Sequence, residues 1–282
     1  MTERVALITG GAGALARAIA ARFTAAGLRV ALADLNRNAA DEVAGDIPGE
    51  LCGLAMDVTS EDSVGAAVDE LLSRWGRIDV LVNNAGLLVR EDSWDMDVST
   101  FDKLTEVNFK GPFLVTRAVV PTMIKQRYGR LVAITSRNSI AGGMPAYGGT
   151  KAGLTALAIS WARELGQWGI TSNAVAPSPI QVTPGLGLLK MTPEQQWERS
   201  SGSIQRTPLQ RLATRDDVAS AVAYFASEDA GFVTGETLYV AGGSQLAPVG
   251  KYPDIPSFNA SGPTATPEQA GIVAAQPARS SA

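Results

Sequence analysis

The fold of this chain is decided near its start by Val5-Ala6-Leu7-Ile8-Thr9-Gly10-Gly11-Ala12-Gly13-Ala14-Leu15-Ala16. The first five residues are mostly apolar and predict a buried strand. A glycine-rich turn follows, and a helix is predicted from Leu15 onward. Such a turn brings backbone N–H groups and the positive end of a helix dipole to one point, where phosphate binds well. Gly11-x-Gly13-x-x-Ala16 also matches the pattern of dinucleotide-binding turns.

Short apolar runs alternate with helical patterns along the rest of the chain. The predicted strands are Val5–Thr9, Arg29–Asp34, Glu50–Asp57, Val80–Asn83, Gly129–Ser136, Ile170–Ala176 and Thr237–Ala241. The predicted helices between them include Leu15–Ala26, Ser60–Trp75, Thr100–Gln126, Tyr147–Gln167 and Arg215–Ala226. Near-continuous apolar strands indicate a parallel sheet that is buried on both faces. We therefore predict an α/β fold with a doubly wound, seven-stranded parallel sheet and ligands at the carboxyl ends of its strands.

Composition excludes several classes of protein. The 282 residues carry a net charge of -4 and no basic run, which argues against a nucleic-acid partner. The chain has no histidine and one cysteine, Cys52, which argues against a zinc site and an internal disulfide. We expect no metal. No apolar run is long enough for a membrane span, and a strand begins too early for a signal peptide, so we expect a cytoplasmic protein.

Two regions break the alternation of strands and helices. Residues from about 177 to 207 follow a strand, are rich in proline and glycine, and occupy the place of a loop that covers a substrate. We assign them to one domain, residues 1–248. Residues 249–282 have no apolar period and form a predicted tail, which is either disordered or an arm that packs on a neighbouring subunit.

Polar residues follow several predicted strands. Asp34 ends the second strand, where a carboxylate can bond the ribose 2′-OH of NAD and repel the 2′-phosphate of NADP; the alternative is that Asp34 caps the next turn. Asp57 and Val58 end the third strand and either meet an adenine ring or cap a helix. Asn83-Asn84-Ala85-Gly86 ends the fourth strand, where a plain turn is also possible.

Tyr147 and Lys151 stand four residues apart in a predicted helix and share one face of it. An ammonium beside a phenol favours the phenolate and lowers the phenol pKa. A tuned phenol can give or take a proton at a carbonyl or alcohol oxygen. A surface pair without function is the alternative when these two residues are considered alone.

Several motifs together resemble those of the short-chain dehydrogenase/reductase family over residues 4–246. They are Thr9-Gly10, Asn83-Asn84-Ala85-Gly86, Asn108 within Val107–Gly111, Ser136, Tyr147-x-x-x-Lys151, Asn173–Pro177 and Gly242-Gly243. The pattern Y-x-x-x-K arises often by chance, whereas the ordered set is specific. The resemblance implies a Rossmann fold and hydride transfer between a nicotinamide and a secondary alcohol or ketone.

The resemblance also implies roles for individual residues. Tyr147 is the general acid/base, Lys151 lowers its pKa and bonds the nicotinamide ribose, Ser136 orients the substrate oxygen, and Asn108 holds a water. The implied cofactor contacts are Gly10, Gly13, Ala14, Leu15, Asp34, Leu35, Asp57, Val58, Asn84, Ala85, Gly86, Tyr147, Lys151, Pro177, Ile180 and Thr183. With Asp34 present, NAD is favoured over NADP.

The chain departs from the family pattern at three places. Ala14 and Ala16 replace two glycines of the turn, and each added methyl group narrows the approach to the pyrophosphate or the first helix. Ser136 lies eleven residues before Tyr147, which is closer than is usual in the family, and Ser139 lies closer still. Thr183 is one residue later than the family threonine.

Substrate identity is the least readable property of the sequence. Candidate substrate contacts are Trp94, Arg137, Asn138, Ser139, Met144, Gln181, Leu186, Leu188, Leu189 and Trp197. Leucine and tryptophan favour a cyclic or hydrophobic alcohol, and the polar residues favour a sugar or polyol. Arg137 either recognises an anionic group or polyol or forms a surface salt bridge.

Three functions remain open from the sequence. An NAD-dependent dehydrogenase fits best; an NADPH-dependent ketoreductase and a cofactor-sensing protein without catalysis are the alternatives. The two long helices resemble those that pair subunits in the family, so we expect a homotetramer or a homodimer. Apolar residues such as Phe113, Val120 and Trp161 are candidates for that contact, and packing in the core is the alternative for them.

Overall fold

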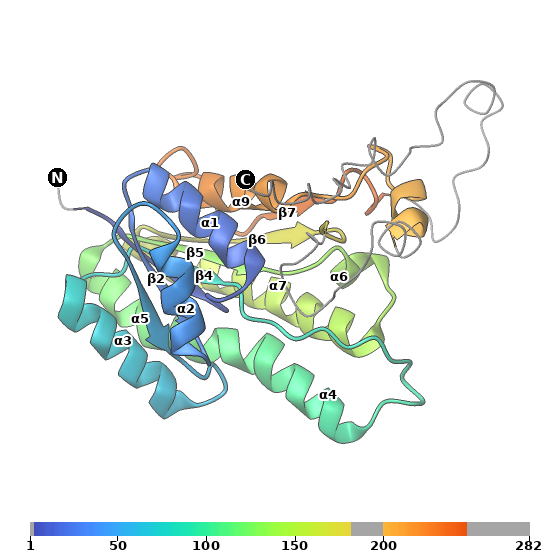
Figure 1. The fold of residues 1–282 in the computed structure, drawn as a ribbon, viewed down its shortest axis with the longest axis horizontal. Coiled ribbons are helices and arrows are strands. Elements are labelled where there is room, and N and C mark those ends of the chain that lie inside the picture. Colours follow the sequence, from blue (N-terminus) through green and yellow to red (C-terminus); the bar gives the residue numbers. More distant parts are fainter. Residues whose placement is uncertain (1–2, 182–199, 247–282) are drawn as a thin grey trace, which may run out of the picture. The chain divides into compact units, whose positions relative to one another are not determined.

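The computed structural model of the protein describes residues 3–181 and 200–246 (Figure 1). Within them, seven parallel strands form one sheet in the order β3-β2-β1-β4-β5-β6-β7. The strands are β1 (Val5–Thr9), β2 (Arg29–Asp34), β3 (Leu51–Ala55), β4 (Val80–Asn83), β5 (Gly129–Ile134), β6 (Ile170–Pro177) and β7 (Thr237–Val240). The predicted doubly wound sheet is confirmed. The strand order reverses between β1 and β4, which is where such sheets bind ligands.

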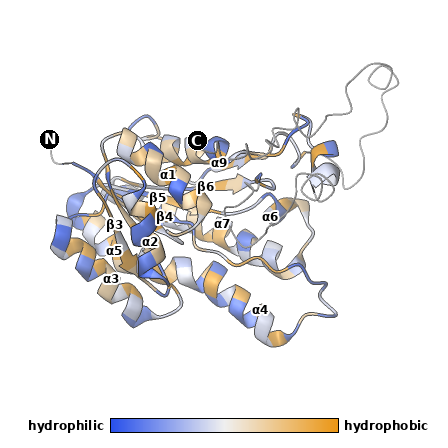
Figure 2. Ribbon diagram, viewed as in Figure 1, coloured by the Kyte–Doolittle hydropathy of each residue, from blue (hydrophilic) through white to orange (hydrophobic). Residues whose placement is uncertain are grey.

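Helices cover both faces of this sheet. They are α1 (Ala14–Ala25), α2 (Arg37–Gly45), α3 (Glu61–Trp75), α4 (Val98–Thr105), α5 (Gly111–Gln126), α6 (Asn138–Ala141), α7 (Pro145–Leu165) and α9 (Arg215–Ala226). Apolar residues of α3, α5 and α7 form one core with the strands. The helices α1 and α9 lie on the opposite face (Figure 1), and Figure 2 shows apolar strands between helices that are apolar on one side. Trp161 belongs to the core and Val120 packs against it, so the core alternative holds for these two residues.

Most element boundaries differ from the predicted ones by one or two residues. Ser60 caps α3 instead of starting it, because its side chain accepts a hydrogen bond from the Ser63 N–H. Helix α7 starts at Pro145, which suits the first turn of a helix. Strands β3 and β5 end earlier than predicted, which leaves Ser136 in a loop. The short helices α2 and α6 were not among the predicted elements.

The predicted helix Thr100–Gln126 is the largest difference. The structure instead has α4, a π-helical turn (Glu106–Lys110) and α5 in succession. A π turn inserts one extra residue and is frequent at functional sites. Gly111 follows the turn, and a Cβ atom there would lie 2.9 Å from Val58 Cγ2. The turn contains Asn108, whose side chain is fully buried.

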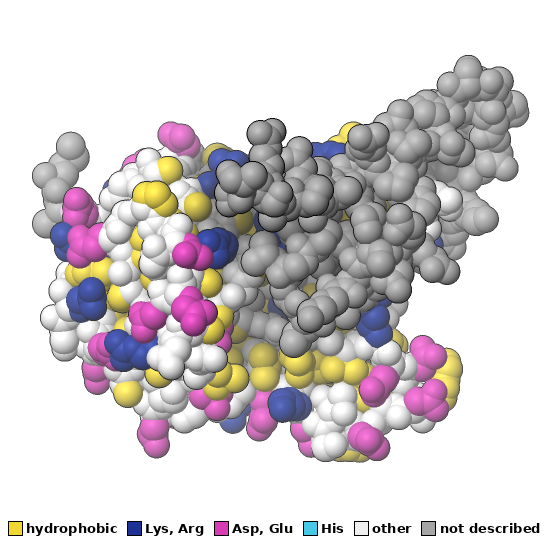
Figure 3. All heavy atoms as spheres, in the orientation of Figure 1, with side chains coloured by type: hydrophobic (Ala, Val, Ile, Leu, Met, Phe, Trp, Pro, Cys, Tyr) yellow, Lys and Arg dark blue, Asp and Glu magenta, His cyan; other side chains and the backbone are white. Residues whose placement is uncertain are grey.

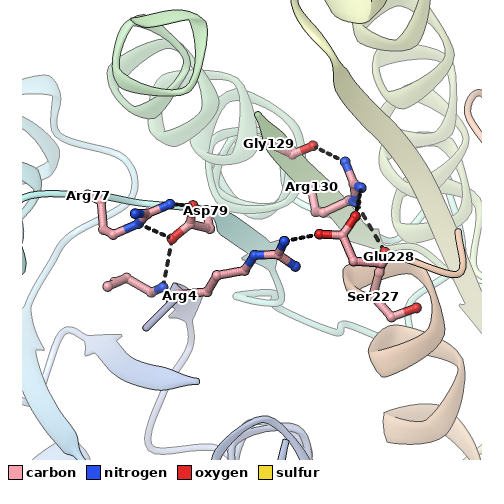
Figure 4. A network of polar contacts seen from close by, with 8 residues as sticks. Arg4, Arg77, Asp79, Gly129, Arg130, Ser227 and Glu228 are labelled. Carbon is pink, nitrogen blue, oxygen red and sulfur yellow. Dashed lines mark hydrogen bonds and ion pairs between the residues drawn. The ribbon is translucent and has the colours of Figure 1, made fainter. Parts of the chain in front are cut away.

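The amino ends of β1, β4 and β5 are joined by a polar network (Figure 4). Asp79 is fully buried; its carboxylate accepts hydrogen bonds from Val5 N–H at 2.8 Å and from Arg77 at 2.8 and 2.7 Å. Glu228, at the end of α9, pairs with Arg4 and Arg130. Both of these guanidinium groups lie 4.4 Å from the centroid of the Tyr128 ring. The network ties the first strand to α9 at the edge opposite the predicted site.

The chain divides into two compact units. The first contains residues 1–177 and 216–240, and with them the whole sheet; the second contains residues 178–215 and 241–282. In the second unit, Gly242 and Gly243 have positive φ, and their Cβ positions would lie 2.7 Å from Thr207 and Pro208. The predicted tail, 249–282, lies outside the described residues. Residues 182–199, which are most of the loop predicted at about 177–207, also lie outside them.

Two surface properties complete the description. Figure 3 shows acidic and basic side chains interspersed on one face of the molecule. In the described part of the chain, no helix combines the length and apolarity needed to cross a membrane.

Candidate active site

The glycine-rich turn after β1 leaves the start of α1 open. Gly10 has φ 66°, which favours glycine, and a Cβ atom there would lie 2.9 Å from Ala85 Cα. Gly13 is the N-cap of α1 with extended backbone, and no side chain caps this end. The first helical residues, Ala14 and Leu15, therefore present their N–H groups at the point where the sequence predicts a pyrophosphate. Ala16 is fully buried.

Asp34 lies at the carboxyl end of β2 beside this turn. Its carboxylate accepts hydrogen bonds from Ala12 N–H at 3.1 Å and from Asn36 N–H at 3.2 Å. Asn36, and not Asp34, is the N-cap of α2, because its side chain accepts from Ala39 N–H. Leu35 follows with an exposed side chain. Asp34 thus supports the turn and keeps oxygen lone pairs for a ribose hydroxyl.

The residues after β4 are fixed against the glycine turn. The Thr9 hydroxyl accepts hydrogen bonds from the N–H groups of Asn84 and Ala85, both at 3.0 Å. The Asn84 side chain donates to the carbonyl oxygens of Thr9 at 2.8 Å and Gly10 at 3.3 Å. The two strand ends therefore form one rigid edge.

Asp57 and Val58 follow β3 at the same edge. Asp57 Oδ1 accepts from the Thr59 N–H at 2.9 Å and from its hydroxyl at 2.7 Å, so Asp57 stabilises its own turn. Ser60 is the helix cap, as described above. Val58 lies against Gly111 at the start of α5.

Lys151 is the buried cation of the site. Its Nζ donates to the Ile134 carbonyl at 2.9 Å and lies 5.8 Å from the centroid of the Tyr147 ring. Burial lowers the pKa of Lys151 to about 8. A Cβ atom at Gly86 would lie 3.3 Å from Nζ and 3.4 Å from Asn108 Oδ1, so glycine leaves a small space in front of both groups.

Tyr147 and Ser136 form the second half of this cluster. Burial raises the pKa of Tyr147, and a hydrogen bond with the Ser136 hydroxyl opposes the shift. The Asn138 N–H fixes the Ser136 oxygen at 3.2 Å. In the chain without cofactor, burial outweighs any lowering by Lys151, so the pKa of Tyr147 is raised and not lowered.

Asn108 connects the π turn to two other elements. Its Oδ1 accepts from Leu87 N–H at 2.7 Å, and its Nδ2 donates to Leu87 O at 2.8 Å and to Thr150 Oγ1 at 3.3 Å. One lone pair on Oδ1 remains for the predicted water. The four predicted catalytic residues therefore come from the π turn, the loop after β5 and α7, and they meet at the carboxyl ends of the strands.

Several predicted substrate contacts lie in the segment between Ser136 and Tyr147. Asn138 and Ser139 start the short helix α6, and Ser139 Oγ is buried with no hydrogen-bond partner in the described structure. Arg137 donates its N–H to Pro177 O at 3.0 Å. Met144 has a positive φ of 52° and precedes α7. The loop expected to be short is thus held in a strained conformation.

The remaining predicted contacts fall into three groups. Trp94 is 80% exposed in a surface turn. Ile180 and Gln181 belong to the second unit, where the Gln181 N–H donates to Ala213 O at 2.8 Å and Ile180 pairs with Ala213. Thr183, Leu186, Leu188, Leu189 and Trp197 lie outside the described residues.

The residues present fit a nicotinamide dinucleotide. The start of α1 has no side-chain cap, Gly10 and Gly86 stand where a side chain would intrude, and Asp34 faces the turn. Gly10, Gly13, Ala14 and Leu15 would hold the pyrophosphate, Asp34 the adenosine ribose, and Lys151 the nicotinamide ribose. Nicotinamide chemistry supplies hydride transfer.

Sequence reasoning missed three groups that organise the site. The backbone of Leu87 and the carbonyl of Ile134 leave no signal in side-chain identity. Thr150 stands inside the Tyr147–Lys151 motif, and a hydroxyl three residues after the tyrosine is a signal that the sequence does carry.

Comparison with known proteins identifies the family. A protein-family model described as enoyl-(acyl carrier protein) reductase matches residues 10–245. The chain belongs to the short-chain dehydrogenase/reductase family. It is therefore an NAD(P)-dependent oxidoreductase that acts on CH–OH groups.

The chain matches two curated relatives over almost the whole length of each. The 3-oxoacyl-[acyl-carrier-protein] reductase of Thermotoga maritima is 36% identical over 252 residues, which are 85% of this chain and 97% of that protein. The (2S)-[(R)-hydroxy(phenyl)methyl]succinyl-CoA dehydrogenase subunit BbsD of Thauera aromatica is 35% identical over 255 residues, with 86% and 97% coverage.

Two solved structures have the same fold. Levodione reductase has a TM-score of 0.77 and 32% identity, and the match covers 88% of this chain and 99% of that one. NAD+-bound xylitol dehydrogenase has a TM-score of 0.77 and 31% identity, with 85% and 98% coverage. These family members act on different alcohols and ketones, so membership does not define the substrate.

Proposed function

We propose that this protein is an NAD-dependent dehydrogenase of a secondary alcohol, with Tyr147 as its general acid/base. The observation that carries the proposal is the cluster of Tyr147, Lys151, Ser136 and Asn108 at one edge of the sheet. A protein that only senses the cofactor needs the glycine turn and Asp34 but not this cluster. Its presence favours catalysis.

The proton chemistry follows from the surroundings of Tyr147. The Ser136 hydroxyl, fixed by Asn138, orients the substrate oxygen beside the Tyr147 hydroxyl. In carbonyl reduction, Tyr147 gives its proton to that oxygen; in alcohol oxidation it takes the proton back. Because burial raises the pKa of Tyr147, its hydroxyl stays protonated in the free protein, which is the form that carbonyl reduction needs. Alcohol oxidation needs the phenolate, so we expect its rate to rise with pH.

Asp34 supports NAD over NADP as the cofactor. A carboxylate at the end of β2 can accept from the ribose 2′-OH, and it repels a 2′-phosphate. The nearby Arg37 is paired with Glu70 at 2.9 Å and with Asp41 at 3.6 Å, so its charge is already balanced. The NAD+ named in the structure of the xylitol dehydrogenase relative agrees with this choice.

The substrate is a cyclic or hydrophobic alcohol, or a polyol. The relatives named for levodione and xylitol represent these two classes. Ser139 supports an oxygen-rich substrate, because its buried hydroxyl has no partner in the described structure and lies one helical turn beyond Ser136. Arg137, Asn138 and Met144 belong to the same segment between Ser136 and Tyr147.

A panel of substrates tests the proposal. Xylitol, cyclohexanol, the corresponding ketones and a 3-oxoacyl thioester are offered with NAD+ or NADP+, or with the reduced forms, and nicotinamide absorbance is followed. We expect NAD-linked turnover of a cyclic alcohol or polyol, and its loss in Tyr147→Phe. Turnover that survives Tyr147→Phe, or no turnover with any pair, contradicts the proposal.

The cofactor choice has its own variant. Asp34→Ala removes the 2′-OH acceptor and the repulsion, so the preference for NAD+ over NADP+ in kcat/KM should fall by at least about 10-fold, or ~1.4 kcal/mol. Glu42→Ala, at an exposed acidic residue of α2, is the control. A wild type that already prefers NADP+ refutes the role of Asp34.

A further inference from the structure

Thr150 lies between Tyr147 and Lys151 on α7 and is buried. Its hydroxyl makes two hydrogen bonds: Oγ1 donates to the Tyr147 carbonyl at 2.8 Å and accepts from Asn108 Nδ2 at 3.3 Å. A backbone carbonyl can only accept, so the single Thr150 proton is committed to Tyr147. Towards Asn108, Thr150 can therefore act only as an acceptor.

This polarity determines which way the Asn108 amide points. Leu87 agrees with Thr150, because its N–H requires the amide oxygen and its carbonyl requires the amide nitrogen. Both Nδ2 protons are thus used, and Oδ1 keeps one lone pair. That oxygen and Lys151 Nζ border the same small space in front of Gly86.

We propose that Thr150 is a positioning residue that, together with Leu87, holds the Asn108 amide so that its oxygen and not its N–H faces the Lys151 ammonium. An oxygen at that place stabilises the ammonium, whereas an N–H repels it. During turnover, a stabilised ammonium in turn stabilises the Tyr147 phenolate, whose ring centroid lies 5.8 Å from Nζ. The catalytic meaning of the inference rests on the proposed function.

Among the described groups around Lys151, few could mask an effect of the Asn108 amide on the Lys151 ammonium. Tyr147 on α7 is the titratable side chain that contacts Lys151. The β5 side contributes the Ile134 carbonyl, the β4 side contributes Gly86, and the π turn contributes Asn108; none of these groups titrates. Burial alone accounts for the lowered pKa of Lys151, with no charged partner to outweigh a change in amide orientation.

A matched threonine on the same helix separates this role from simple helix stabilisation. Thr155 Oγ1 donates to the Lys151 carbonyl at 3.0 Å, as threonines in helices commonly do. Thr155 has no hydrogen bond with Asn108 in the described structure. Thr155→Val therefore removes a helix hydroxyl and leaves the amide orientation intact.

The first measurement uses the protein without cofactor. The Lys151 side chain is titrated against pH through its Cε chemical shift in wild type, Thr150→Val, Thr150→Ser and Thr155→Val. The signal that is missing in Lys151→Met assigns the resonance. Thr150→Val should titrate about one pH unit lower than wild type, while Thr150→Ser and Thr155→Val should match wild type.

The second measurement is the pH profile of kcat for NAD+-linked oxidation of the alcohol found in the substrate panel. The rising limb should move to higher pH in Thr150→Val and return in Thr150→Ser. Circular dichroism checks folding, and Thr150→Ala replaces Thr150→Val if the valine variant does not fold.

The two measurements separate the inference from the proposed function. An unchanged Lys151 titration in Thr150→Val, an equal shift in Thr155→Val, or no recovery in Thr150→Ser overturns the inference. A wild type without activity on any alcohol overturns the proposed function, and the Lys151 titration still decides the role of Thr150.

Discussion

At the level of single residues, the burial of Lys151 costs stability but serves the proposed function. Burial of its ammonium is unfavourable, as the lowered pKa of about 8 shows. The Ile134 carbonyl is the only hydrogen-bond acceptor of Nζ in the described structure. The proposed chemistry nevertheless needs a cation beside Tyr147. Buried titratable groups with shifted pKa values are typical of catalytic sites for this reason.

Lys151→Met tests this conflict through the pH dependence of stability. The pKa of Lys151 is lower in the folded than in the unfolded chain, so its contribution to stability is present at high pH and lost as pH falls through about 8. Between pH 8 and pH 10, wild type should therefore gain on the variant in unfolding free energy, by at most about 3 kcal/mol. Urea unfolding at both pH values measures the gain.

The exposed lysine Lys125 provides the comparison. Lys125→Met should show a stability difference from wild type that stays flat over the same pH range. A flat difference for Lys151→Met as well would mean that Lys151 is hydrated in solution and carries no burial penalty.

At the level of elements, the carboxyl ends and the amino ends of the strands (the carboxyl edge and the amino edge of the sheet) have separate roles. The carboxyl edge gathers the glycine turn, Asp34 and the catalytic cluster, and the π turn brings Asn108 to that cluster. The amino edge contains the Asp79 network and no proposed site residue. Stability and catalysis can therefore be changed separately.

The amino edge gives a prediction about stability alone. Asp79→Asn removes the charge of a fully buried carboxylate that binds Val5 N–H and Arg77, and should cost about 2–4 kcal/mol. Glu228→Gln removes the charge of a more exposed carboxylate, which pairs with Arg4 and with the buried Arg130, and should cost less than Asp79→Asn. Chemical unfolding gives both costs. Neither variant should change kcat, so a slower Asp79→Asn enzyme would show that the two edges are coupled.

At the level of the whole molecule, the exposed apolar side chains of the described residues include two sets on different elements. One set lies on α4, the π turn, α5 and α7 and contains Val98, Phe101, Phe109, Phe113 and Ile159. The other contains Tyr224 on α9, Phe232, and Leu238 on the edge strand β7. We propose that the two sets belong to separate interfaces, since two kinds of twofold interface produce a tetramer.

This arrangement predicts a stepwise loss of assembly. Phe113→Glu and Leu238→Glu each place a charge in one patch, so each variant should sediment as a dimer, and the double variant as a monomer. Ser73→Glu, on the exposed side of α3, should remain a tetramer. Sedimentation velocity measures all four proteins together with wild type. A wild-type monomer refutes the proposed assembly.

Much of the fold was predictable because it depends on local pattern. Apolar strands between helices indicated the parallel sheet, and the glycines at residues 10–13 indicated the turn at its carboxyl edge. The break near Asn108 was missed although Gly111-Pro112 signals it, because a proline inside a helical pattern ends or bends the helix. The place of Trp161 stayed open because a core face and an interface have the same period, and the structure places it in the core.

The sequence by itself determined the family, the order of strands and helices, and the identity of Tyr147, Lys151, Ser136 and Asn108, because motif and periodicity are properties of the chain. Only the tertiary structure decided their state. Burial depends on what packs around a side chain, and it raises the pKa of Tyr147 and lowers that of Lys151. The orientation of the Asn108 amide likewise depends on Leu87 and Thr150, which come near it only in the folded chain.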